Sequence, residues 1–151
     1  MGVSNPNKLW VTVDLSSATW NTAATHEVFT VTGVVRAKLW VYCTLTLTDT
    51  ADAARIVFGD ETTTNSLIAS TAGATAGAAL IATGDLWYDA TPDLLIANYS
   101  TAVFDKVING LDIGYEISGA AFLTGGLVFG CEWEALSAGA TVVAGAGGVL
   151  A

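Results

Sequence analysis

The residues of this chain that could do acid–base chemistry are few, and the first of them is His26, the only histidine. A single histidine excludes a metal site built on paired histidines and leaves a catalytic triad only one possible base. No serine lies in a GxSxG elbow, and no glycine-rich loop leads into Lys-Ser or Lys-Thr as a phosphate-binding loop does. We therefore expect His26, which precedes Glu27 at the start of a predicted strand, to be an ordinary structural residue.

Three aspartates recur at every fourth residue, at Asp85, Asp89 and Asp93. Such a series could supply oxygen ligands for Ca²⁺ or a pair of carboxylates for general acid–base work. The spacing does not match an EF-hand loop, and Thr91 and Pro92 between the last two indicate a turn, where aspartate is common. We favour the turn interpretation, and we expect no metal, no cofactor and no enzymatic activity.

The two cysteines, Cys43 and Cys131, are far apart in the sequence, and neither belongs to a CxxC motif. Both fall on the apolar phase of their predicted strands, which favours buried free thiols over a metal pair. A disulfide between them stays open as an alternative.

Five tryptophans are the remaining candidates for ligand binding, because aromatic faces suit sugar rings and protein interfaces. Trp87 and Trp133 lie in predicted strands, where a core position is the default. Trp10 and Trp40 share the polar phase of their strands, so we expect them to contact another chain. Trp20 lies in a polar loop and must pack either on its own domain or on a neighbour.

The elements that position these residues are β-strands. From residue 28 to residue 48, apolar residues and glycine occupy the odd positions, while threonines and the basic pair Arg36 and Lys38 occupy many of the even ones. This period of two predicts strands with one buried face. Because one unbroken strand of that length would reach roughly 70 Å at about 3.3 Å per residue, we expect a bend or turn near Gly33.

Shorter strands are predicted on either side of this stretch, at residues 9–15, 55–59, 66–70, 84–89, 103–108, 113–117, 127–135 and 141–144. Residues 16–25 are predicted to be a loop, and residues 72–84 a loop or a short, weak helix. The pattern predicts one all-β domain over residues 1–151, an antiparallel β-sandwich with a jelly-roll-like arrangement. Residues 1–7 are predicted to be an N-terminal arm and residues 145–151 a glycine-rich tail, each flexible or bound to a partner.

The charges suggest one strand pairing. Arg36 and Lys38 occupy the polar face of one predicted strand, and Glu132 and Glu134 occupy that of another. Opposite charges directly across two antiparallel strands are favourable. Our hypothesis is that these two strands are antiparallel neighbours, and finding them in different sheets would refute it.

Only 13% of the residues are charged, against about 25% in a typical soluble domain, and the formal net charge is −9. Either threonine, serine and asparagine supply the missing polarity, or, as we favour, much of the surface is buried against other chains. The acidic balance argues against nucleic acid and anionic membranes as partners. No secretory signal and no apolar run of membrane-spanning length is visible, so we expect synthesis in a cytoplasm.

Four stretches of the chain resemble a family of small proteins of tailed bacteriophages, the capsid decoration or cement proteins encoded near the major capsid gene. They are HEVFTVTGVVRAKLWVYCTLTLT at 26–48, DLWYDATP at 85–92, KVINGLDIGYEI at 106–117 and CEWEALSAGATVVAGAG at 131–147. The resemblance implies a β-rich homotrimer, made in the host cytoplasm, that binds the major capsid protein on the outside of the phage head and stabilises its lattice.

The partner interface is predicted to use the exposed aromatic and basic residues, namely Trp10, Trp20, Arg36, Lys38 and Trp40. Two alternatives stay open. One is another virion role, such as a head-fibre or tail component. The other, from a different class, is a carbohydrate-binding adhesin module that uses exposed tryptophan and tyrosine.

Overall fold

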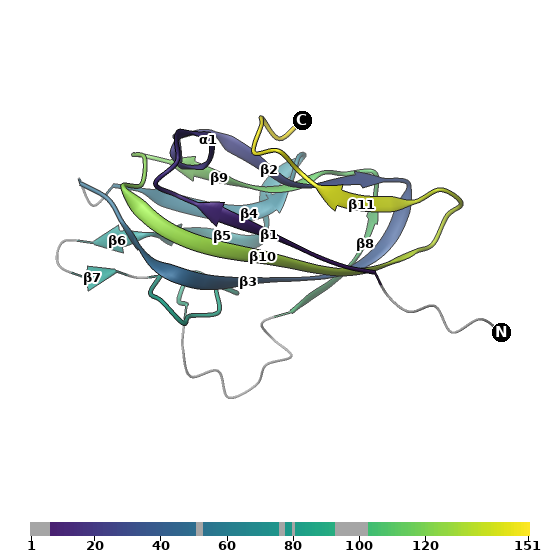
Figure 1. Cartoon of the computed structure of the whole chain (residues 1–151), viewed down its shortest axis with the longest axis horizontal. Coiled ribbons are helices and arrows are strands. Elements are labelled where there is room, and N and C mark those ends of the chain that lie inside the picture. The colour runs from purple at the N-terminus through teal and green to yellow at the C-terminus, as the bar shows by residue number, and fades with distance from the viewer. Residues whose placement is uncertain (1–6, 51–52, 76–77, 80, 93–102) are drawn as a thin grey trace.

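The computed structural model describes residues 7–50, 53–75, 78–79, 81–92 and 103–151. Its two main antiparallel β-sheets pack face to face (Figure 1), and a third sheet has only two short strands. Sheet A has four strands in the order β1 (Asn7–Asp14), β10 (Thr124–Ala135), β3 (Val34–Thr48), β8 (Phe104–Asn109). Sheet B has five, in the order β11 (Thr141–Ala144), β2 (Thr25–Thr32), β9 (Ile113–Ser118), β4 (Arg55–Asp60), β5 (Thr63–Ala72). The predicted all-β antiparallel sandwich is confirmed.

The order of the strands is that of a hairpin rolled up on itself. β1 pairs with β10, β2 with β9, β3 with β8 and β4 with β5, all antiparallel, so each pair is nested inside the previous one. Successive pairs alternate between the two sheets: β1–β10 and β3–β8 lie in sheet A, and β2–β9 and β4–β5 lie in sheet B. This nesting is the jelly-roll arrangement.

The predicted break at Gly33 is where the chain passes from sheet B to sheet A. Gly33 has φ = 69°, a left-handed conformation that favours glycine. A Cβ atom at this position would lie 2.8 Å from the Ser137 Oγ atom, so Ser137 would have to shift to admit a side chain. The regular alternation of residues 28–48 therefore serves two strands in two sheets.

The core lies between the sheets and is built around stacked aromatic rings. The rings of Tyr115 and Phe129 are 5.5 Å apart and nearly parallel, and Phe58 lies 5.1 Å from Phe129. The odd positions of β3 are buried as predicted, with one exception, Leu45, which is exposed. The register between β10 and β3 shifts on both sides of Gly126, and this irregularity displaces Leu45 from the buried phase.

Three local predictions were wrong. Residues 84–89 form no named strand; Leu86 makes only an isolated bridge with Tyr42, and this segment follows the edge of β3 through backbone hydrogen bonds. The predicted loop at 16–25 contains a single helical turn, α1 (Ala18–Asn21), which the Ser17 side chain caps. Within the predicted loop at 72–84 lie the two-residue strands β6 (Ala74–Thr75) and β7 (Ala78–Ala79). Among the described residues no helix is long and apolar enough to cross a membrane.

The C-terminal tail, residues 145–151, continues the line of β11 beside β2. The backbone N–H groups of Gly145 and Gly147 donate to the carbonyls of Val28 and Glu27, and the N–H of Glu27 donates to Gly148 O. Leu150 is buried. The sequence predicts a flexible or partner-bound tail; within this chain these hydrogen bonds hold it. Residues 1–6 of the predicted arm lie outside the described residues, and Asn7 begins β1.

Candidate functional site

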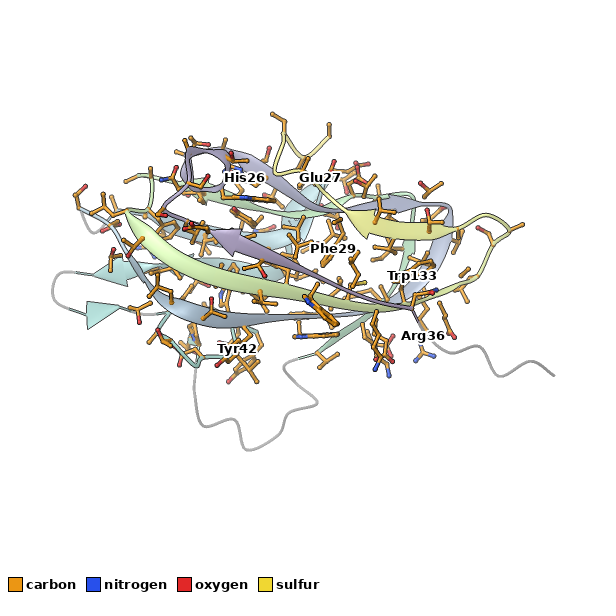
Figure 2. All side chains as sticks on the ribbon, viewed as in Figure 1. His26, Glu27, Phe29, Arg36, Tyr42 and Trp133 are labelled. Atoms are coloured by element: carbon orange, nitrogen blue, oxygen red, sulfur yellow. The ribbon has the colours of Figure 1, made fainter. Side chains whose placement is uncertain are left out.

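The solvent-facing side of sheet A, which we call the outer face, carries four of the five residues predicted to contact a partner. Trp10 lies on β1, and Arg36, Lys38 and Trp40 lie on β3, all on the phase that points away from the core. Figure 2 shows Arg36 and Tyr42 on this side of β3, away from Phe29, which lies between the sheets. The alternation in the sequence therefore places these side chains correctly.

The hypothesis that β3 and β10 are antiparallel neighbours is confirmed. Lys38 lies opposite Glu132 and Arg36 opposite Glu134 in the register of the two strands. The Arg36 guanidinium lies 3.8 Å from Glu134 Oε1. Lys38 itself forms no ion pair with a described residue, because Glu132 instead lies 3.5 Å from Lys8 Nζ on β1.

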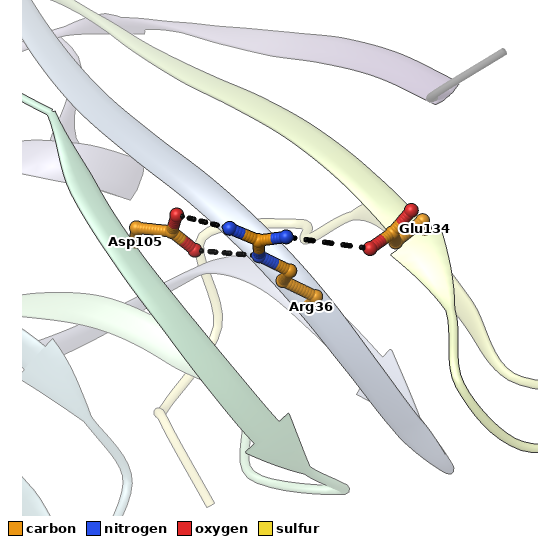
Figure 3. A network of polar contacts seen from close by, with 3 residues as sticks. All are labelled: Arg36, Asp105 and Glu134. Atoms are coloured by element: carbon orange, nitrogen blue, oxygen red, sulfur yellow. Dashed lines mark hydrogen bonds and ion pairs between the residues drawn. The ribbon is translucent and has the colours of Figure 1, made fainter.

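The strongest partner of Arg36 is Asp105 on β8, which the sequence analysis did not single out. The Arg36 Nε and Nη2 atoms donate to the two Asp105 oxygens at 3.0 and 2.7 Å, so the guanidinium is held between two carboxylates (Figure 3). These hydrogen bonds lower the pKa of Asp105 and raise that of Arg36. The fork fixes the orientation of both planar groups.

Next to this charged cluster the same face carries an aromatic row. Trp10, Gly130 and Trp40 lie directly opposite one another on β1, β10 and β3. A Cβ atom on Gly130 would lie 2.0 Å from Trp40 Cε2 and 2.4 Å from its Nε1, so the indole of Trp40 occupies the space above the glycine. Trp40 is half-buried, whereas Trp10 is 64% exposed. Tyr42, one row further on, is also exposed.

A shallow pocket of 180 Å³ opens beside this row. It is lined by Arg36, Lys38, Glu132, Trp133 and Glu134. Trp133 itself packs partly against the core, as its predicted strand position suggests. The pocket is thus bounded by cations and carboxylates that come from β3 and β10 and that point to the same side of the sheet.

Trp20, the fifth predicted contact residue, lies elsewhere. It sits on α1, where its ring is 6.4 Å from that of Tyr115 and 6.5 Å from that of His26. Its carbonyl accepts a 2.7 Å hydrogen bond from the Tyr115 hydroxyl, and Gly147 of the tail lies against the indole. Trp20 therefore packs on its own domain, which is one of the two outcomes that its polar loop allowed.

The residues with potential acid–base chemistry are engaged in structural contacts. His26 is buried, and its ring nitrogens face the carbonyls of Thr22 and Gly147 at 2.9 and 3.4 Å. Asp85 accepts from the N–H of Ala82, and Asp89 accepts from Thr91, as expected of turn residues. Asp93 lies outside the described residues. No group of three or more metal-ligating side chains occurs in the described part of the chain.

Both cysteines are buried free thiols. Burial raises the pKa of Cys43 and of Cys131 to about 12, so neither carries an activated thiolate at neutral pH. Trp87 is fully buried and its Nε1 atom donates to Thr71 Oγ1 at 2.9 Å, which places it in the core as predicted.

A second candidate surface, which we call the terminal edge, consists of β1, β11 and the tail 145–151. β1 ends sheet A and β11 ends sheet B, and these two strands lie against each other (Figure 1). Val143 on β11 is 52% exposed and Val149 in the tail is 73% exposed. An edge strand presents backbone groups that can pair with another chain, so this side is suited to protein contacts.

No family model, no curated protein and no solved structure matches the chain. The function is therefore inferred from these two surfaces and from the residues themselves.

Proposed function

We propose that this protein is a non-catalytic structural component of a virion, a capsid decoration protein that binds the major capsid protein on the outside of a phage head. The terminal edge makes the contact with protein partners, which include the shell and the neighbouring copies in a homotrimer. Bound to the assembled lattice but not to free capsid subunits, the protein stabilises the lattice by mass action.

The proposal has two lines of support from the chain as a whole. The amino-acid sequences of its strands and turns resemble those of phage decoration proteins, and the jelly roll is a fold that viral shell proteins use. A fold alone does not specify a function, because many functions share each common architecture. The surfaces of the molecule are therefore more informative about function than its fold.

The observation that carries it is the terminal edge. The first and last strands of the chain are both edge strands and they lie together. The tail that follows β11 carries the most exposed large apolar side chain among the described residues, Val149. The exposed Val143 on an edge strand, together with the exposed Val149 of the tail that follows it, suits an interface that combines apolar burial with strand pairing. A modest contact is sufficient, because a lattice repeats it many times and multiplies its effect.

Co-sedimentation with empty heads assembled from the major capsid protein tests the proposal. We expect the unaltered protein to pellet with heads, and Val143→Asp combined with Val149→Asp to remain in the supernatant. The matched control is Val107→Asp, which places the same charge at a 67% exposed valine on β8, the opposite edge strand of sheet A. We expect this control to bind heads normally.

Light scattering during size-exclusion chromatography tests the trimer separately. A mass of three times 15.5 kDa supports it, and a clean monomer contradicts it. If the protein binds isolated tails and not heads, the decoration role is wrong and a tail role replaces it.

A further inference from the structure

We propose that the outer face of sheet A is a binding site for a neutral carbohydrate chain. The indole of Trp40 is the stacking platform, and the adjoining charged pocket supplies the hydrogen bonds. This is a second binding activity, on a surface distinct from the terminal edge that we assign to the capsid, so the two proposals stand or fall separately.

The platform exists because Gly130 has no side chain. The Trp40 indole fills the place of a side chain on that glycine, so it lies across β10 instead of standing out from β3. The strand covers part of the ring and leaves the rest accessible, which agrees with its intermediate burial. A flat, supported aromatic ring is the surface on which the apolar face of a sugar ring stacks, and little side-chain entropy is lost on binding.

The residues that line the pocket lie two to four residues from Trp40 on β3 and from Gly130 on β10, which is about 7–13 Å along the strands at about 3.3 Å per residue. Its volume of 180 Å³ suits a single sugar ring. Arg36 is held by Asp105 and Glu134, so the donors and acceptors of this site are already oriented before a ligand arrives. Sugar hydroxyls are both donors and acceptors, and such a mixed array of fixed partners matches them.

The charge balance of the outer face favours a neutral ligand. The charged side chains around the pocket are three cations and three carboxylates, namely Lys8, Arg36, Lys38, Asp105, Glu132 and Glu134. Their sum is zero, so no excess of positive charge is present to attract a phosphate, a sulfate or a uronic acid. The chain as a whole has a net charge of −9, which disfavours anionic polymers further.

The aromatic row is longer than a single sugar ring. Trp10 lies across Gly130 from Trp40, roughly 9.5 Å away at about 4.8 Å per strand spacing, and Tyr42 lies one row on. The row crosses the strands, so a linear chain that follows it contacts Trp40 and Trp10 in succession. We infer an oligosaccharide and not a monosaccharide as the preferred ligand.

An array of neutral and anionic oligosaccharides, probed with the labelled full chain, tests the site. We expect binding to neutral glycans that titration calorimetry then confirms, with affinity rising with chain length. Trp40→Ala should weaken it about tenfold or more, as removal of a central aromatic anchor does. Gly130→Val keeps Trp40, but the valine side chain fills the space that the indole occupies, so we expect the same loss of glycan affinity. Circular dichroism verifies that both variants are folded.

The control is Val143→Asp, which alters the terminal edge and should bind glycans as the unaltered protein does. The inference is overturned if no neutral glycan binds, or if Trp40→Ala and Gly130→Val bind as well as the unaltered chain. Binding restricted to anionic glycans and abolished by salt would overturn the choice of a neutral ligand. If Trp40→Ala no longer co-sediments with heads and no glycan binds the unaltered protein, the inference is also overturned, and the outer face is a protein interface instead.

Discussion

Replacement of Trp87 by alanine should destabilise the protein far more than the same replacement at an exposed tryptophan. Trp87 is fully buried, although it lies in a segment that forms no regular strand. Its Nε1 atom donates to Thr71 Oγ1 at 2.9 Å, its backbone N–H donates to Val41 O at 3.0 Å, and its ring lies 6.4 Å from that of Phe58. Trp87 therefore attaches this segment to sheet B through its side chain and to sheet A through its backbone.

The magnitude follows from the buried area. A tryptophan side chain buries roughly 200 Å², and at about 25 cal/mol per Å² this corresponds to about 5 kcal/mol of transfer free energy. Measured Trp→Ala changes in cores are about 3–5 kcal/mol. We expect a loss of about 4 kcal/mol for Trp87→Ala. For Trp87→Phe we expect about 2 kcal/mol, because the phenyl ring keeps most of the contacts but loses the hydrogen bond to Thr71.

Urea unfolding followed by circular dichroism measures these values, with the midpoint falling and the slope unchanged. The matched control is Trp10→Ala, in which the residue removed is of the same type but 64% exposed, and its loss should stay within about 0.5 kcal/mol. Equal losses for Trp87→Ala and Trp10→Ala would refute the assignment of Trp87 to the core and of Trp10 to the binding face.

Three further predictions concern pH, thiol reactivity and backbone conformation. Partial burial acts to raise the pKa of Asp60, but hydrogen bonds from Thr62, Ser66 and Thr63 outweigh it and lower the pKa. A depressed folded-state pKa gives stability that is present above the unfolded value of about 3.9 and is lost as the pH falls through the folded value. Urea midpoints measured from pH 7 to pH 2 should therefore fall more steeply below about pH 4 for the unaltered chain than for Asp60→Asn, and parallel curves would contradict this. Cys43 and Cys131 should resist a thiol-specific reagent at pH 8 in the native state and react in urea, because burial raises the pKa of both to about 12; rapid labelling of the folded protein would be the opposite result. Gly33→Ala should lower the free energy of unfolding more than Gly139→Ala does. Both glycines have positive φ, which costs about 1–3 kcal/mol for other residues, but only at Gly33 would the added Cβ also lie 2.8 Å from Ser137 Oγ. Equal unfolding free energies for the two variants would show that this close contact is relieved at no cost.

The sequence predicted the local pattern of sheet A well, because one side of a strand must be apolar. The even phase of β3 placed Arg36, Lys38 and Trp40 on the outer face, and the opposite charges of Glu132 and Glu134 identified β10 as the neighbour. Leu45 was misassigned, because the register irregularity, in which β3 has extra residues opposite β10, has no trace in the alternation of the β3 sequence.

The parts that could not be predicted depend on contacts between distant segments. Asp105 lies in a predicted strand, but nothing in the local sequence indicates that this strand pairs with β3, so the principal partner of Arg36 was missed. Residues 84–89 alternate like a strand, yet only Leu86 forms a bridge, since the segment follows the edge of β3 by irregular hydrogen bonds. The position of the Trp40 indole had one indication in the sequence, the glycine at position 130 within a predicted strand. A glycine in a strand often marks a place where another group approaches the backbone closely.

The central claim is that this chain acts through two separate surfaces, a terminal edge for protein partners and an outer face that stays accessible. A density map of capsid heads saturated with the protein tests it most directly. We predict density on the outside of the shell, with β1, β11 and the tail against the capsid or a neighbouring copy and with Trp40 facing solvent. Density in which the outer face of sheet A is pressed against the shell, or heads that carry no added density, would contradict the claim.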